Sequence, residues 1–146
     1  MKKIWIVPVI LLLTAGTINA AEKNVNVEKS VDAEKNVELS KMHLNKGASF
    51  VKSKKLEKAI DEFKKAIELN PSESASYYNL GLCYIRLGRF QEAVEPLETC
   101  VTFHPDKAKA HYNLGYVYTK IGEKDKALTA YNKALQLNPD LADHSK

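Results

Sequence analysis

One period recurs through most of this sequence and constrains its fold more than any other feature. Three prolines stand at equal intervals, Pro71, Pro105 and Pro139. Glycines, alanines and large apolar residues keep the same interval: Gly47, Gly81, Gly115, Ala59, Ala93, Ala127, Phe50, Tyr84, Tyr118, Phe63, Leu97 and Tyr131. A fixed period of about 34 residues indicates one supersecondary unit stacked on copies of itself, because a single unit cannot cover its own apolar face. A stacked array presents a long binding surface and seldom encloses a reaction chamber.

The register of the repeat gives units at 40–73, 74–107 and 108–141. Each unit is predicted to hold two helices joined by a tight turn. In the second unit, Gly88 supplies the left-handed conformation that ends the first helix, and Pro105 stops the second one near Phe103. Gly122 has the same role in the third unit, whereas Lys54 stands at this place in the first. The sequence therefore predicts an all-α fold, followed by a short tail at 142–146.

Residues 1–20 have the pattern of a secretory signal peptide. Two lysines precede an apolar run from Ile4 to Leu13, and small residues follow as far as Ala20. The apolar run is too short to span a bilayer, which needs about 20 residues. We expect cleavage after Ala20 and export to the periplasm or beyond. The alternative is an uncleaved leader that anchors the protein to the membrane.

Residues 21–39 differ in composition from the repeats. A short motif of charged residues, asparagine or serine, and valine recurs there three times, and the segment is rich in charge and contains no aromatic residue. Such a segment buries too little apolar surface to offset its chain entropy, so it is predicted to be a charged, flexible linker. From about Asp32 it could instead extend the first helix.

Charge and chemistry give no support to nucleic-acid binding or catalysis. Loss of residues 1–20 removes two of the 22 basic side chains and none of the 18 acidic ones, which leaves a net charge of +2. Nucleic-acid binding instead requires a basic stripe on a suitable fold. No histidine pairs with another ligand at metal spacing, and no phosphate-binding loop or nucleophile elbow occurs. We therefore predict a protein that is not an enzyme and that needs no cofactor or metal.

The two cysteines are predicted to stay unpaired. Cys83 lies on the first helix of its unit and Cys100 well along the returning helix. Their heights along the helices are expected to differ too much for a disulfide.

At its periodic positions the sequence resembles the tetratricopeptide repeat (TPR) family. The family pattern of a large residue, Leu-Gly, Tyr, Ala, an aromatic or large residue and Pro is matched in the second unit by Tyr77, Leu80, Gly81, Tyr84, Ala93, Leu97 and Pro105. The third unit matches equally well, with His111, Leu114, Gly115, Tyr118, Ala127, Tyr131 and Pro139, and the first more weakly. The resemblance implies a right-handed α–α superhelix, a solenoid of three helix pairs. It also implies a concave groove lined by each first helix, and a role as a protein-binding scaffold.

Helical angles indicate which side chains face that groove. At 100° per residue, positions 4, 7, 8 and 11 of each unit share one packing face, so positions 2, 5, 6, 9, 12 and 13 lie opposite. The predicted peptide-binding residues at these places are Asn45, Asn79, Asn113, Tyr78, Tyr112, Tyr116, Leu82, Lys109, Arg86 and Lys120. The family's two-carboxylate clamp for chaperone tails is not expected, because Leu44, Ala48 and Asn113 replace three of its residues.

Asparagine and a basic residue recur in the groove at fixed places. Asn45, Asn79 and Asn113 occupy position 6 in every unit, and an amide can both donate to and accept from a peptide backbone. Some members of the family use such an asparagine ladder, although this residue is also common in the repeats. Position 13 is always basic, which favours acidic or carboxylate-ended peptides but also complements the helix dipole. The tyrosines are either anchors for a ligand or packing partners of one another.

Together these features predict a non-catalytic scaffold or adaptor of the bacterial cell envelope that holds an extended segment of a partner protein in a basic, asparagine-lined groove. The alternative is a structural subunit that associates with itself. Solenoids usually close with a polar terminal helix. Without such a helix, the last helix would expose apolar surface for self-association, formed by Leu128, Tyr131, Leu135 and Leu137.

Overall fold

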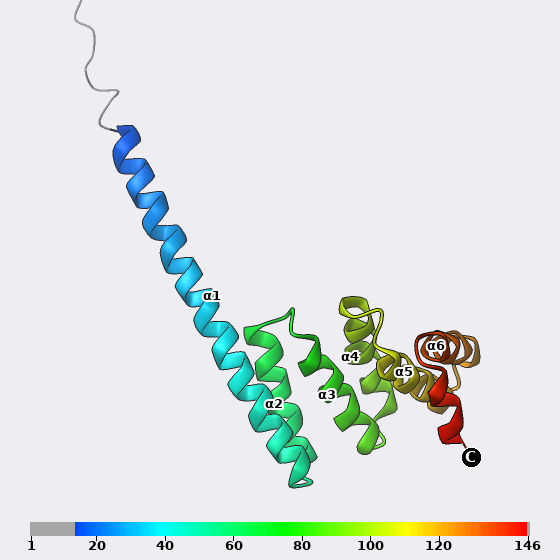
Figure 1. Cartoon of the computed structure of the whole chain (residues 1–146). Helices are drawn as coiled ribbons and strands as arrows, with labels where there is room; N and C mark the ends of the chain where they lie inside the picture. Colours follow the sequence, from blue (N-terminus) through cyan, green and yellow to red (C-terminus); the bar gives the residue numbers. More distant parts are fainter. Residues whose placement is uncertain (1–13, 146) are drawn as a thin grey trace, which may run out of the picture. The chain divides into compact units, whose positions relative to one another are not determined.

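The computed structural model describes residues 14–145, and the burial of side chains for residues 31–142. Its elements are α1 (Thr14–Lys52), α2 (Leu56–Leu69), α3 (Ser74–Arg86), α4 (Phe90–Phe103), α5 (Ala108–Ile121), α6 (Lys124–Leu137) and the 3-10 helix η2 (Pro139–Ser145) (Figure 1). The described residues contain no strand. The predicted all-α class and the three helix pairs are confirmed.

Each predicted turn and stop coincides with a helix end. Gly88 and Gly122 have φ angles of 72° and 86°, in the left-handed region that glycine adopts without steric cost. Lys54, which replaces glycine in the first unit, has a φ of 57°. The periodic prolines each follow shortly after the second helix of a pair. Period, turn chemistry and helix ends therefore agree in all three units.

The segment predicted to be a flexible linker is helical instead. Helix α1 begins at Thr14 and continues through residues 21–39 without interruption. No proline or glycine lies between Ile18 and Lys46, and alanine, glutamate and lysine, which are good helix formers, are frequent there. The side chains of residues 31–39 are exposed, so this stretch buries as little as its composition predicted. The segment is thus helical where a flexible linker was predicted, in agreement with the alternative that residues from Asp32 extend the first helix. The low burial expected from its composition is seen for residues 31–39.

The chain divides into two compact units, residues 1–36 and residues 37–146. The three helix pairs belong to the second unit. The predicted signal peptide falls mostly on residues 1–13, which lie outside the described part.

The two helices of each pair meet at a glycine. Gly47, Gly81 and Gly115 each face a large side chain of the second helix in the pair, namely Phe63, Leu97 and Tyr131. A Cβ atom added at Gly81 would lie only 2.7 Å from Leu97 Cγ. Leu97 is fully buried, together with Phe63 and the alanines Ala59 and Ala93. The core is thus a row of equivalent contacts in which glycine lets a large residue of the partner helix approach the backbone.

The two cysteines are part of this core. Cys83 and Cys100 are buried and do not form a disulfide with each other. Burial raises the pKa of the Cys83 thiol to about 11 and also raises that of Cys100. Both side chains therefore stay uncharged near neutral pH and act as small apolar groups.

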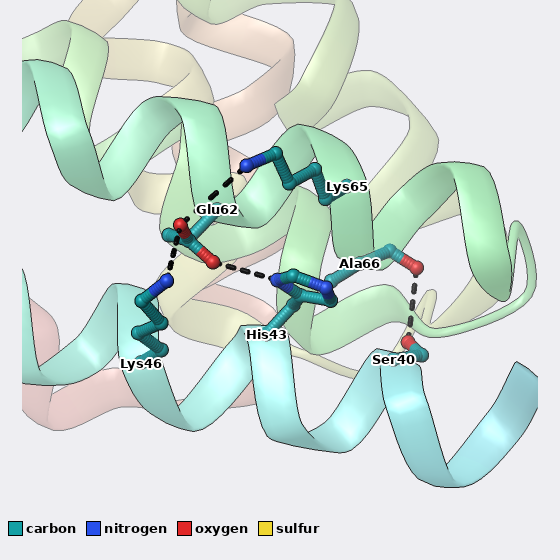
Figure 2. A network of polar contacts seen from close by, with 6 residues as sticks. All are labelled: Ser40, His43, Lys46, Glu62, Lys65 and Ala66. Carbon is teal, nitrogen blue, oxygen red and sulfur yellow. Dashed lines mark hydrogen bonds and ion pairs between the residues drawn. The ribbon is translucent and has the colours of Figure 1, made fainter.

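The first helix pair is fastened by a polar network (Figure 2). The carboxylate of Glu62 on α2 is buried, with His43 Nδ1 2.6 Å from Oε2 and Lys46 Nζ 3.0 Å from Oε1. Lys65 Nζ lies 3.7 Å from the same Oε1. One turn away, the hydroxyl of Ser40 donates to the carbonyl oxygen of Ala66 at 2.9 Å. These contacts compensate the cost of removing a carboxylate from water.

The network follows from the place of this pair at the start of the array. Lys46 occupies the repeat position that holds the buried Leu80 and Leu114 in the next two units. Those leucines lie next to Ile67 and Val101 of the preceding pair. The first repeat has no preceding repeat to cover an apolar residue there, so an exposed lysine fits. Repeat one therefore serves as the polar N-terminal cap of the array.

The last helix is not left bare. Helix η2 packs against α6, and Tyr131, Leu135 and Leu137 are half-buried. Leu128 is 63% exposed. The apolar surface proposed for self-association is therefore smaller than the sequence suggested, and self-association stays a prediction.

We predict that Gly81→Ala lowers the free energy of unfolding by about 1–3 kcal/mol, because the new methyl group overlaps the buried side chain of Leu97. The measurement is urea denaturation followed by circular dichroism. Gly122→Ala is the matched control: its Cβ meets no atom within 4 Å, so only the backbone cost of about 1 kcal/mol applies. Equal losses in the two variants would contradict the close contact.

A second prediction concerns acid stability. The hydrogen bond from His43 and the charge of Lys46 hold the pKa of Glu62 below its ordinary value, against the opposing effect of burial. The ionised carboxylate therefore stabilises the fold above the unfolded-state pKa of about 4.3, and this contribution is lost as pH falls through the folded-state pKa.

Glu62→Gln should thus lose about 1–3 kcal/mol at pH 7 and show a flatter loss of stability between pH 5 and 3, which are about one unit on either side of the unfolded-state value. Glu92→Gln is the control, because Glu92 makes an exposed ion pair with Arg89 and should change little. The role of the network is refuted if both variants follow the same pH profile.

Candidate functional site

The predicted groove residues come from α1, α3 and α5, the first helices of the three pairs. Asn45 is exposed, and Asn79 and Asn113 are half-buried. The tyrosines and Leu82 are half-buried, whereas the basic residues Arg86, Lys109 and Lys120 are exposed. None of these ten side chains belongs to the buried core. All ten are thus at least partly exposed, and their role in binding a peptide stays a prediction.

A direct contact joins the groove side chains of successive repeats. Asn113 Nδ2 on α5 donates a hydrogen bond of 3.1 Å to the hydroxyl oxygen of Tyr78 on α3. Lys107 Nζ lies 4.0 Å from the centre of the Tyr78 ring, where a cation is attracted by the ring face. Burial raises the pKa of Tyr78, and the bond from Asn113 partly opposes this. Tyr78 is therefore neutral at physiological pH, and its hydroxyl can still donate to a carbonyl or carboxylate.

The three asparagines are consequently not equivalent. Within the described part of the chain, the side chains of Asn45 and Asn79 make no hydrogen bond. Their amides are free to donate and accept, as an extended peptide backbone requires. The amide of Asn113 already has one donor in use, which leaves its oxygen free as an acceptor.

The other two groove tyrosines have aromatic partners. The ring of Tyr112 meets that of Tyr131 on α6 edge to face, with centroids 5.3 Å apart. Tyr116 meets Phe90 on α4 in the same way at 6.0 Å, and Lys120 Nζ lies 5.2 Å from the Tyr116 ring. These contacts fix the rings at their inner edges. Tyr112 and Tyr116 are thus half-buried and packed against aromatic neighbours.

Lys107 is the contributor that sequence reasoning missed. It precedes α5 directly, after Pro105, and so falls outside the helical positions from which the groove was predicted. A comparison of the repeats at this position would have singled it out, because the residue before the first helix changes from Glu73 before α3 to Lys107 before α5. A cation at this junction adds positive charge beside Tyr78.

Other kinds of site receive little from the described residues. Within residues 14–145, no three His, Cys, Asp or Glu side chains gather as ligands for a metal would. His43 is bound to Glu62, and His111 Nε2 lies 3.0 Å from the carbonyl oxygen of Pro105. A search of the same residues also finds no helix with the length and apolar character of a membrane span.

Comparison with known proteins agrees with this geometry. A family model described as TPR repeat matches residues 47–88 and 83–122, and one described as tetratricopeptide repeat matches residues 108–141. The latter match coincides with the third unit deduced from the sequence. No curated protein matches the chain.

Several solved structures share the fold. The second TPR of Spaghetti (RPAP3), bound to the HSP90 peptide SRMEEVD, is 21% identical with a TM-score of 0.69, over 73% of this chain and 98% of that one. The Arabidopsis OM64 TPR domain is 26% identical with a TM-score of 0.68, over 72% and 87%. A MamA protein is 26% identical with a TM-score of 0.65, over 76% and 60%.

The matched repeats run from residue 47 to residue 141, and their helix pairs, turns and glycine contacts are those described above. The chain belongs to the tetratricopeptide repeat family.

Proposed function

We propose that this protein is a non-catalytic interaction scaffold that holds an extended segment of a partner protein in the groove lined by α1, α3 and α5. The observation that carries the proposal is the hydrogen bond between Asn113 and Tyr78. It places side chains of two successive repeats next to one another, as one continuous binding surface requires. The amides of Asn45 and Asn79, which have no recorded partner in the described residues, would bind the backbone of the segment.

Charge narrows the class of partner. Lys107, Lys109 and Lys120 accompany the three groove tyrosines, and Arg86 ends α3. A basic groove attracts acidic or carboxylate-ended segments, and it does so mainly by raising the association rate. The tyrosine rings would then contact the apolar side chains of the segment. An acidic segment with scattered apolar residues is the ligand that fits.

Solved structures of similar fold support peptide binding without naming the ligand. Two TPR structures of Spaghetti (RPAP3) contain an HSP90 peptide. Resemblance to the family implies that such tails are bound by a two-carboxylate clamp, and this chain lacks most of the residues of that clamp. Leu44 and Ala48 replace a lysine and an asparagine, and Asn113 replaces an arginine. We therefore propose a different acidic segment.

The proposed test is a triple variant, Asn45→Ala, Asn79→Ala and Asn113→Ala, used as bait in a pull-down from bacterial envelope extract. The variant should fold, because all three residues lie outside the core, and it should lose the partner that the wild-type chain retains. The matched control is Gln91→Ala, Asn132→Ala and Gln136→Ala, which removes three amides from α4 and α6, outside the groove. If both triple variants retain the partner equally, the groove proposal is wrong.

We propose further that the protein is exported and acts in the periplasm or outside the cell. The support is the pattern of residues 1–20, with its two lysines, short apolar run and small residues before Ala20. Expression of the full chain in a bacterium, followed by fractionation and intact-mass spectrometry, is expected to give an exported product that begins at Ala21. A full-length product in the membrane fraction would instead identify an anchored protein.

A further inference from the structure

We propose that the protein has a second interaction surface, a cleft at the third repeat that binds the apolar side chain of an acidic segment of a partner protein. The cleft has a volume of about 490 Å³. Val101 of α4, Leu114 and Tyr118 of α5 and Ala130 of α6 form its apolar floor. Lys126 and Lys133 of α6 stand at its rim. None of these residues belongs to the predicted groove.

The repeat provides an internal comparison, because the second unit has the same cleft. Its volume is about 450 Å³, and its floor includes Ile67, Leu80 and Tyr84, which occupy the repeat positions of Val101, Leu114 and Tyr118. The rims differ. Lys126 and Thr129 of the third unit replace Glu92 and Glu95 of the second. Two clefts of similar size therefore differ in charge.

The charges around each cleft determine which partner fits. The second cleft is lined by one lysine and three glutamates, Lys64, Glu68, Glu92 and Glu95, so it repels an acidic segment. The third is lined by two lysines, by Asp125 and by His111, whose Nε2 lies 3.0 Å from the carbonyl oxygen of Pro105. Glu98 of α4 lies beside the floor of the third cleft, where its carboxylate accepts a hydrogen bond from the Tyr118 hydroxyl.

The lysines themselves are available to a ligand. Lys126 makes a distant, exposed ion pair with Glu123 at 3.9 Å, and its Nζ lies 5.5 Å from the centre of the Tyr118 ring. Lys133 makes no ion pair within the described residues. An acidic segment would thus place its carboxylates toward α6 and one apolar side chain on the floor. Burial of that side chain supplies the attraction, and the lysines select the charge.

The test uses the full chain with Asn45→Ala, Asn79→Ala and Asn113→Ala, so that the groove lacks its amides, and a fluorescein-labelled peptide with one phenylalanine between two pairs of glutamates. Fluorescence anisotropy should show binding, which replacement of the glutamates by lysine or of the phenylalanine by alanine abolishes. Lys133→Glu should weaken binding about tenfold, whereas Lys124→Glu, an equal change on α6 outside the cleft, should stay within about twofold. Thr129→Trp, which fills the cleft, should abolish binding, and Glu95→Trp, at the same place in the second cleft, should not.

A separate readout distinguishes this surface from the groove. In the triple asparagine variant, which lacks the amides of the groove, the peptide should still give NMR shifts on α6 around Thr129 and Ala130. Shifts confined to α1, α3 and α5, equal behaviour of the two tryptophan variants, or no binding at all would overturn the proposal. So would light scattering that shows a second copy of the chain occupying the cleft and excluding the peptide.

Discussion

The close approach of two helices at a glycine is the contact on which the rest of this structure depends. Gly47, Gly81 and Gly115 let the side chains of Phe63, Leu97 and Tyr131 reach the backbone of the partner helix. Since the contact recurs once in every repeat, each pair has nearly the same internal geometry. Equal pairs can then pack in series, α2 against α3 and α4 against α5. The fold is a consequence of one local contact made in each repeat.

Serial packing of equal units also explains where binding can occur. The bond between Asn113 and Tyr78 joins two of the first helices, α5 and α3. Substitutions of Asn45, Asn79 and Asn113 should change the surface and leave the core intact, because none of these residues belongs to the buried core. The same logic applies to the outer clefts, where a constant floor of leucine and tyrosine carries a variable rim. A repeat protein can therefore change its ligands while it keeps its fold.

Much of this was predictable from the sequence because helix pairs rest on local rules. Gly88 and Gly122 marked turns and Pro105 marked a stop, and each does so in the structure. Contacts between side chains of different helices were not predictable, because they depend on how closely the helices pack. No sequence pattern indicated that Glu62 is buried beside His43 and Lys46, and Lys107 lay outside the helical positions that were considered. The linker prediction was wrong because low burial does not prevent helix formation in a stretch free of proline and glycine.

The central claim is that the face formed by α1, α3 and α5 binds a partner, and site-specific photo-cross-linking in living cells tests it most directly. A photoreactive amino acid would replace Leu82 in the groove in one strain and the exposed Gln91 of α4 in another. If this face binds a partner, the groove position should capture one defined protein through an extended, acidic segment, whereas the α4 position should not. Capture of that protein from Gln91 alone, or equally from both positions, would contradict it.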